Sequence, residues 1–370
     1  MNNIKLIAVL IFVVGCSSES PQSKFESLLD SEWSKIVNDN PVYASSMGDL
    51  SKNTEWSDTS VENIYSDHQH QLDVLSQLDE LDISDFSDDN KVNYLLFKQQ
   101  YENSIESHAY KTFLIPFSHR GGIQLQHETT SIVPFRNKQH YLDWIERISK
   151  IDVLVDAAIE KGKIGIAEEI VPPRFLMQKV YKQIELQAFV KPKDSPFYRT
   201  FLEMDRSINK IETEEIQKKA LNVIKSKVIP AYVKLHRFFK DEYLPACRTP
   251  IGIKEIKNGK EYYEFLARKF TTTNLTPKEI HEIGLAEVAR IRDEMDAIIQ
   301  EVKWEGDFKS FLDDLRTNPK FYYETSEELF ESYLATSKRI DPELVKLFKV
   351  LPSMPYGLKP IPMESAPDTT

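Results

Sequence analysis

The chain has 370 residues, of which 41% are apolar and 28% charged, so it has the composition of a folded globular protein with a substantial core. Its net charge of -11 argues against a nucleic-acid surface, because binding to phosphates needs concentrated lysine and arginine. The acidity by itself says little about a substrate, since it also keeps a protein soluble.

The first sixteen residues predict export. A short positively charged start is followed by unbroken apolar sequence over residues 6–14 and then by Gly15 and Cys16. The apolar run is about half of the roughly 20 residues that a membrane-spanning helix needs, and the pattern is typical of a secretory signal. The order Val13-Val14-Gly15-Cys16 resembles a bacterial lipobox, in which the cysteine is acylated and becomes the new N-terminus. An ordinary signal with a chance cysteine is the alternative.

We therefore predict a signal peptide over residues 1–15, a lipidated tether over 16–24 and a single helical domain over 25–370. Lipidation of Cys16 would attach the protein to a membrane of the bacterial cell envelope, on the periplasmic side, and Ser17 favours the outer membrane. The sequence holds one further cysteine, Cys247, which then has no intrachain disulfide partner. We expect Cys247 to be a buried apolar residue.

Helical periodicity dominates the rest of the chain, and only eleven glycines are present. Apolar residues at three- and four-residue spacing predict helices, in chain order, at about 25–39, 60–81, 88–107, 138–149, 151–163, 175–187, 213–239, 276–302, 308–315 and 326–350. Residues 112–135 break this pattern and predict a loop with short extended pieces. Pro230 is expected to kink or split its helix. Thr276-Pro277-Lys278-Glu279 marks the best-specified helix start. The fold class is a mainly α, bundle-like helical domain with at most short strands.

No catalytic signature is evident. The sequence lacks the glycine-flanked serine of a hydrolase elbow and the glycine pattern of a dinucleotide site. His281-Glu282 and His127-Glu128 lack the second histidine of a zincin helix, where two imidazoles one turn apart face one metal ion. We therefore predict no catalytic residue and no metal ligand, and interpret both His-Glu pairs as structural or surface groups. His68 and His70 cannot share a helical face and are interpreted as solvated.

Two short segments are candidates for a substrate cleft. His119, Arg120, Gly121 and Gly122 place a histidine and an arginine on a glycine-bearing loop, where the backbone can approach a ligand closely. Tyr356 precedes a glycine in the proline-rich tail. The alternative for both segments is an ordinary tight turn.

Several stretches together resemble the bacterial family filed as domain of unknown function 885, over essentially everything after the tether. They are Asn40–Ala44 with Met47–Asp49, His119–Gly122, Ile170–Arg174, Ser195–Tyr198, Tyr262-Tyr263 with Thr271–Thr273, Leu275–Leu285, Arg339–Pro342, Met354–Gly357 and Ala366–Thr370. The resemblance implies a mostly helical, often lipid-anchored protein similar to zincin metallopeptidases. It places the family's histidine- and glutamate-containing helix downstream of Ala366–Thr370. Zinc is therefore expected only in a full-length relative, and no cofactor in this chain.

Three functional hypotheses follow as expectations. The first is the N-terminal helical portion of a lipid-anchored, metallopeptidase-like hydrolase with a peptide substrate in the full-length protein. Since the chain lacks the zinc-binding helix, we expect it to be inactive alone, truncated at its C-terminal end and prone to aggregation. The alternative is a non-catalytic helical envelope lipoprotein that binds a peptide or protein partner. A self-contained hydrolase with an unrecognised site is a third hypothesis.

Overall fold

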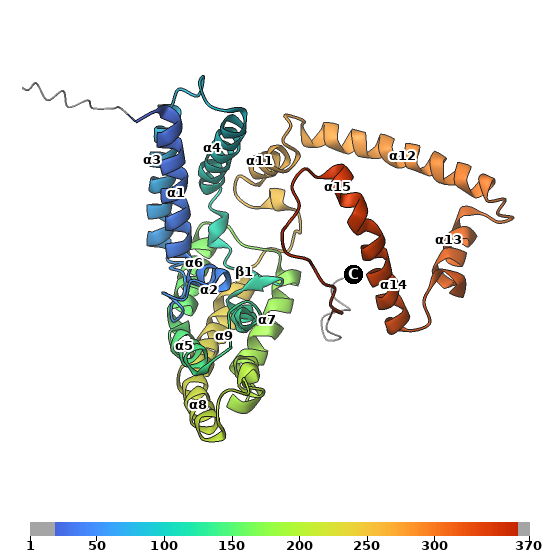
Figure 1. Ribbon diagram of the computed structural model, residues 1–370. Coiled ribbons are helices and arrows are strands. Elements are labelled where there is room, and N and C mark those ends of the chain that lie inside the picture. Colours follow the sequence, from blue (N-terminus) through green and yellow to red (C-terminus); the bar gives the residue numbers. More distant parts are fainter. Residues whose placement is uncertain (1–18, 362–370) are drawn as a thin grey trace, which may run out of the picture. The chain divides into compact units, whose positions relative to one another are not determined.

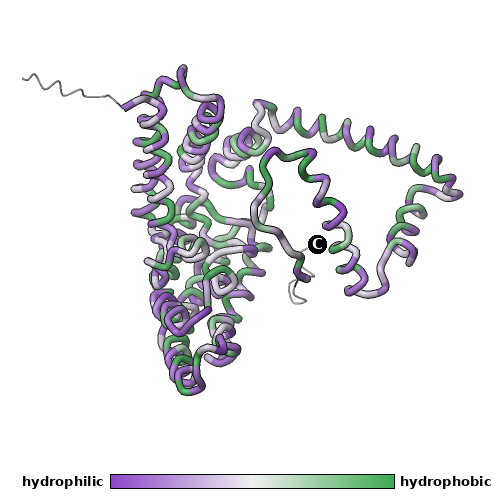
Figure 2. Tube along the Cα trace, in the orientation of Figure 1, coloured by the Kyte–Doolittle hydropathy of each residue, from purple (hydrophilic) through white to green (hydrophobic). Residues whose placement is uncertain are grey.

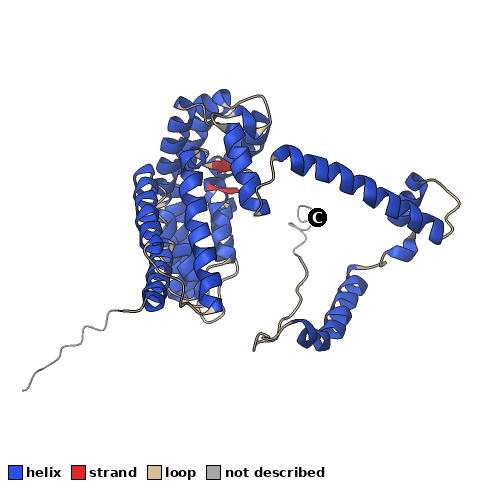
Figure 3. Cartoon of the chain, turned by 90° about the horizontal axis from the view of Figure 1, so that it is seen from above, coloured by secondary structure: helices blue, strands red, loops and turns tan. Residues whose placement is uncertain are grey.

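The computed structural model describes residues 19–361 and is predominantly helical (Figure 1). Its contacts divide the chain into two compact units, one ending at Pro277 and one beginning at Lys278. The sequence predicts a single domain over residues 25–370, and the boundary follows a non-helical segment at 272–276. Figure 3 shows two short strands among the helices of the first unit. The predicted mainly α fold with at most short strands is confirmed.

Helices build the first unit. They are α1 (Pro21–Asp39), α2 (Pro41–Met47), α3 (Val61–Asp79), α4 (Asp88–Ala109), α5 (Lys138–Ser149), α6 (Ile151–Ala167), α7 (Arg174–Ala188), α8 (Lys210–Val223), α9 (Ile229–Phe238), α10 (Leu244–Ala246) and α11 (Gly259–Thr271). Several starts agree with the sequence because a polar side chain caps them. The side-chain oxygens of Ser60, Ser87 and Asn137 each accept a hydrogen bond from a backbone N–H in the first turn of α3, α4 and α5.

Helix α1 begins four residues before the predicted start at Phe25 and takes in the end of the predicted tether. The Ser20 hydroxyl accepts a hydrogen bond from the backbone N–H of Ser23, at 3.1 Å. Pro21 occupies the first position, where a helix has no partner for an N–H group. The local capping chemistry therefore sets this boundary, although Pro21–Lys24 are too polar for the apolar pattern to include them.

Two apolar cores stabilise the first unit. A small one joins α1, α3 and α4 through buried aromatic and aliphatic side chains, namely Phe25, Val74, Leu78, Phe86, Tyr94 and Tyr101. The larger one lies among α5 to α9, and its fully buried members include Ile148, Val155, Val180, Ile184, Tyr232 and Leu235. Cys247 belongs to the larger core, as predicted. Burial raises the pKa of its thiol to about 12, so the thiol stays protonated at neutral pH.

The long predicted helix at 213–239 is one helical path interrupted by two π-turns, at Ile224–Val228 and Phe239–Tyr243. Each π-turn lies just before a proline, Pro230 in the first case and Pro245 in the second. A proline inside a helix lacks the N–H donor and its ring crowds the carbonyl four residues earlier. A widened π-turn relieves that crowding. The chain therefore continues through Pro230 with a π-turn between α8 and α9.

The second unit consists of α12 (Pro277–Glu301), α13 (Phe308–Thr317), α14 (Ser326–Ile340) and α15 (Leu344–Leu347) among its described residues. Helix α12 begins at Pro277, as the capping pattern predicts. The helix predicted over 326–350 instead ends at Ile340, because Pro342 follows in a 3-10 turn at Asp341–Glu343.

Many large apolar side chains of the second unit are exposed. Along helix α12, hydrophilic and hydrophobic residues alternate within each turn (Figure 2). Its exposed apolar residues recur at helical spacing, and α14 adds others; they are Ile283, Val288, Ile291, Met295 and Ile298 on α12 and Leu329, Tyr333 and Leu334 on α14. None of the described helices combines the length and apolar character needed to span a bilayer.

Candidate functional site

The predicted segment His119–Gly122 forms the end of a β-hairpin. Strand β1 (Phe117–Ser118) pairs antiparallel with β2 (Gly121–Gly122), so that His119 and Arg120 are the two residues of the turn. Gly122 has a φ of 121°, which L-residues with a side chain rarely adopt, and a Cβ there would lie 3.0 Å from Gln124 Oε1. The turn itself therefore accounts for Gly122.

Two glutamines hold this turn. The buried Gln124 side chain donates through Nε2 to the backbone carbonyl of Ser118, at 2.6 Å, and to Gln183 Oε1, at 3.2 Å. Gln183 on α7 donates in turn to the backbone carbonyl of His119, at 3.1 Å. The hairpin is thus fixed on α7. Contact of His119 or Arg120 with a substrate stays a prediction.

Tyr356 lies in the second unit and the hairpin lies in the first. Its hydroxyl donates to Asp341 Oδ1 at 3.0 Å, next to the end of α14. The carboxylate of Asp341 also accepts from Lys338, and these two donors, Lys338 first, lower its pKa. Tyr356 therefore ties the tail to α14. Cys16, the predicted lipid attachment site, lies outside the described residues.

The two His-Glu pairs lie where the sequence predicts. His281 and Glu282 are exposed on α12. His127 is partly buried in the first unit, where its Nδ1 accepts a hydrogen bond from Gln187 at 3.0 Å and its ring lies edge-on to Phe197. Within residues 19–361, no group of three or more histidine, cysteine, aspartate or glutamate side chains is placed to hold a metal ion.

Protonation of His127 is expected to destabilise the fold. Burial, with a smaller contribution from Arg199, lowers the pKa of His127 from 6.5 to about 4. The unfolded chain then binds the proton more readily, so the contribution of the neutral ring is complete above pH 6.5 and is lost as the pH falls from 6.5 towards 4. We expect a loss on the order of 2 kcal/mol in urea unfolding between pH 7 and 4.5, after allowance for the exposed part of the ring.

The variant H127Q is expected to flatten that part of the pH dependence. H281Q, the same replacement at an exposed histidine of α12, is the matched control. If H127Q has the same pH dependence of stability as the parent, protonation of His127 does not cause the loss of stability.

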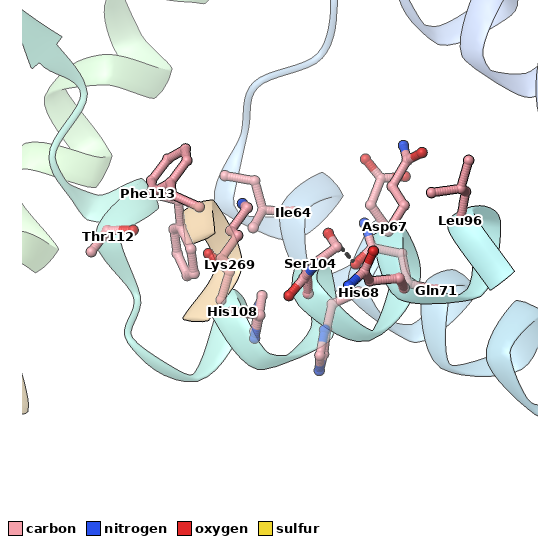
Figure 4. A pocket seen from close by; sticks show the side chains of 15 residues that line it. Ile64, Asp67, His68, Gln71, Leu96, Ser104, His108, Thr112, Phe113 and Lys269 are labelled. Atoms are coloured by element: carbon pink, nitrogen blue, oxygen red, sulfur yellow. Dashed lines mark hydrogen bonds between the residues drawn. The ribbon is translucent and has the colours of Figure 1, made fainter. Parts of the chain in front are cut away.

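A large cavity lies in the first unit, between α3, α4 and α11. It has a volume of about 770 Å³, and we call it the α3–α4 groove. Its two walls are stripes of side chains at helical spacing, Ile64, Asp67, His68 and Gln71 on α3 and Gln100, Asn103, Ser104, Ser107 and His108 on α4. Gln71 Oε1 accepts a hydrogen bond from the Ser104 hydroxyl at 2.9 Å across the groove (Figure 4).

A stacked pair of histidines lines one part of the groove. The rings of His68 and His108 are parallel, with centroids 3.7 Å apart, and Phe113 stacks on His108. His68 Nδ1 and His108 Nε2 are buried, and neither has a hydrogen-bond partner within the described chain. Burial, then the neighbouring His68 and Lys111, lower the pKa of His108. His108 is therefore neutral at pH 7, and each of the two rings keeps one buried nitrogen without a hydrogen-bond partner among the described residues.

A smaller cavity of about 200 Å³ adjoins the groove and shares Asp67, Gln71, Gln100 and Ser104 with it. It contains Glu32, whose buried carboxylate accepts hydrogen bonds from the Tyr101 hydroxyl at 2.5 Å and from His70 Nε2 at 2.9 Å. The prediction that His68 and His70 are solvated is therefore wrong. Because they lie on different faces of α3, one meets α4 and the other meets α1.

Sequence reasoning missed the groove, although one signal was present. The polar residues of α4 follow the i, i+3, i+4, i+7, i+8 spacing of one helix face, from Gln100 to His108. The adjoining face of α4 supplies Tyr94 and Tyr101 to the small core. Such a stripe of amides, hydroxyls and imidazole, nearly free of charge, differs from an ordinary solvated face. The sequence could not show that α3 and α11 lie opposite it.

The comparison with protein families shows the family of this chain. A family model described as "Bacterial protein of unknown function (DUF885)" matches residues 41–370. The chain belongs to this family. Its α2–α4 segment, groove and second unit all lie within the matched range. The comparison with functionally described proteins gives no match.

A solved structure shares the fold. It is described as "the putative lipoprotein from Colwellia psychrerythraea" and matches with a TM-score of 0.81 at 21% sequence identity. The match covers 95% of this chain but only 64% of that one. At this identity the likeness concerns the fold alone, and this chain spans somewhat less than two thirds of the length of that structure.

Proposed function

We propose that this chain is the N-terminal helical portion of a lipid-anchored hydrolase of the bacterial cell envelope that is similar to zinc metallopeptidases. The observation that carries the proposal is the difference in length from the solved structure. Nearly the whole chain fits that fold, yet 36% of the other chain has no counterpart in it. The exposed apolar stripes of α12 and α14 are consistent with surfaces that such an additional portion covers. Alone, the chain hydrolyses no peptide.

The decisive measurement is the intact mass of the protein recovered from its native host, together with peptide hydrolysis by the same sample. A species heavier than the 43.0 kDa of this sequence, with hydrolysis that a chelator abolishes, is expected. A species near 43.0 kDa, less the signal and plus lipid, with stoichiometric zinc and hydrolysis of its own, would contradict the proposal.

Replacing Cys16 is expected to release the protein from the membrane. An acyl chain contributes about 0.8 kcal/mol per buried methylene group, and a stable anchor needs more than one chain. The variant C16S should therefore move from the detergent phase to the aqueous phase in a phase-partitioning experiment. C247S is the matched control and stays in the detergent phase, because Cys247 is buried in the core of the first unit. Equal partitioning of C16S and the parent would rule out lipidation at this residue.

A specific observation favours the alternative function as well. The α3–α4 groove offers a built surface for a ligand and requires no hydrolytic centre. In that case the protein is a non-catalytic envelope lipoprotein that binds a peptide or protein partner. If the protein recovered from its native host has a mass near 43.0 kDa and hydrolyses no peptide, the result favours this alternative.

A further inference from the structure

The lining of the α3–α4 groove has an unusual composition. Four carboxamides face it, those of Gln71, Gln99, Gln100 and Asn103, together with the hydroxyls of Ser104, Ser107 and Thr112. Each carboxamide carries both a donor and an acceptor at the spacing of a peptide group. The walls are helices, whose own backbone groups are already paired, so recognition here must come from side chains. Such a surface matches a ligand with alternating N–H and C=O groups.

The two ends of the groove differ in charge. Figure 4 shows Lys269 towards the side of Thr112 and Phe113, and Asp67 and Gln71 towards the side of Leu96. Lys269 forms no ion pair within the described residues, and its ammonium lies 5.7 Å from the centroid of the Phe265 ring. Asp67 is already paired with Lys35 at 3.0 Å. Lys35 is also paired with Asp39, so the cluster at the Asp67 end keeps a negative charge, and the positive charge of the groove lies at the α11 end.

Helix α11 is fixed against α4, which makes that end a defined position. Arg268 donates to Glu106 at 2.5 Å, and Tyr110 stacks on Phe265. Lys269, the next residue, is thereby held beside the groove.

From these contacts we propose that the α3–α4 groove binds a short extended peptide, with the peptide's C-terminal carboxylate at Lys269 and its main-chain amides against the carboxamides of α3 and α4. The volume of about 770 Å³ falls within the range of ligand sites. The apolar side chains of Ile64, Leu96 and Phe270 border the groove and receive the peptide's side chains. The inference rests on the alternative function, for which it names the ligand of the groove, and it requires no hydrolytic step.

A glycan fits the same groove less well. Sugars bind in part by stacking a face of the ring on an aromatic side chain; Phe270 is exposed at the groove, whereas one face of Phe113 is already stacked against His108. A neutral glycan also leaves Lys269 without a partner. The glycan is therefore an outcome to be distinguished by experiment.

The test is fluorescence polarisation of the processed protein with fluorescein-labelled Ala-Leu-Ala-Leu-Ala, in two forms, with a free C-terminal carboxylate and with an amidated one. We expect the free form to bind, and amidation to weaken binding about tenfold or more, as loss of a charged hydrogen bond does. K269M should weaken the free form by a similar factor and leave the amidated form unchanged. K260M, on the same helix but outside the groove, is the matched control.

A second variant addresses the carboxamides. N103L should weaken both forms of the peptide equally, because Asn103 contacts main-chain amides rather than the terminus. Equal binding of the two peptide forms, or no effect of K269M, would overturn the proposal. Binding of an N-acetylglucosamine tetramer without binding of either peptide would overturn it in favour of a glycan site. No hydrolysis is measured, so the result is independent of the proposed hydrolase.

Discussion

Replacing Arg147 by alanine is expected to lower the free energy of unfolding by about 3–5 kcal/mol, the range for large losses of buried volume with unpaired polar groups. Arg147 on α5 is fully buried and its Nη2 donates to Ser45 Oγ at 2.9 Å and to the carbonyls of Pro41 and Lys52 at 3.4 Å. Its guanidinium lies 5.6 Å from the centroid of the Trp56 ring. One side chain thus fixes α2 and the loop after it against α5.

Burial lowers the pKa of Arg147 to about 10, against the opposing charges of Asp143 and Glu55. Keeping this charged guanidinium buried costs free energy. Removing the charge should therefore offset part of the stability that is lost with its contacts. R147M keeps most of the volume and removes the charge, so we expect it to cost roughly half as much as R147A. R237A, at an exposed arginine, is the control and should stay within about 0.5 kcal/mol of the parent. Urea unfolding measures all three. A loss below 1 kcal/mol for R147A would show that this guanidinium does not hold α2 in place.

The fold could be predicted where local chemistry decides it. The helix start at Pro277 follows from Thr276, proline and Glu279 alone, and α5 begins after Asn137, whose side chain caps it. The end of α14 at Ile340 was missed because apolar residues continue past Pro342, and the apolar pattern outweighed the proline. Interactions between residues within one helical turn of each other can be predicted from the sequence.

The candidate site depends instead on contacts between distant segments. Glu32 is a carboxylate on α1 that is buried because His70 and Tyr101, far along the chain, supply its hydrogen-bond donors. His68 meets His108 only because α3 and α4 pack antiparallel across the loop between them. The glycines predict the turn at His119–Gly122, whereas nothing in the sequence predicts that Gln183 holds this turn. Sequence periodicity identifies faces but not which faces meet.

Replacing Gly165 by alanine is expected to destabilise the first unit by about 2–3 kcal/mol, the upper part of the range for overpacking. Gly165 is buried in α6, and a Cβ there would lie 2.6 Å from the carbonyl oxygen of Leu114 and 2.9 Å from that of Ile170. Both obstacles are backbone atoms, and the Ile170 N–H also donates to the Gly165 carbonyl at 2.8 Å. The close approach therefore cannot relax by a side-chain rotation, and α6 must move away from residues 112–114.

Two glycine variants calibrate this expectation. In G162A, on the same helix, the new Cβ meets the Phe238 ring at 3.0 Å, and since a side chain can shift, the cost should be smaller than for G165A. In G284A the Cβ meets no atom within 4 Å, and alanine should stabilise α12 by roughly 0.5–1 kcal/mol through its helix propensity. Thermal and urea unfolding rank the three variants. If G165A costs no more than G162A, then the contact of α6 with residues 112–114 is looser than described, and the wall of the groove at Thr112 and Phe113 is adjustable rather than fixed.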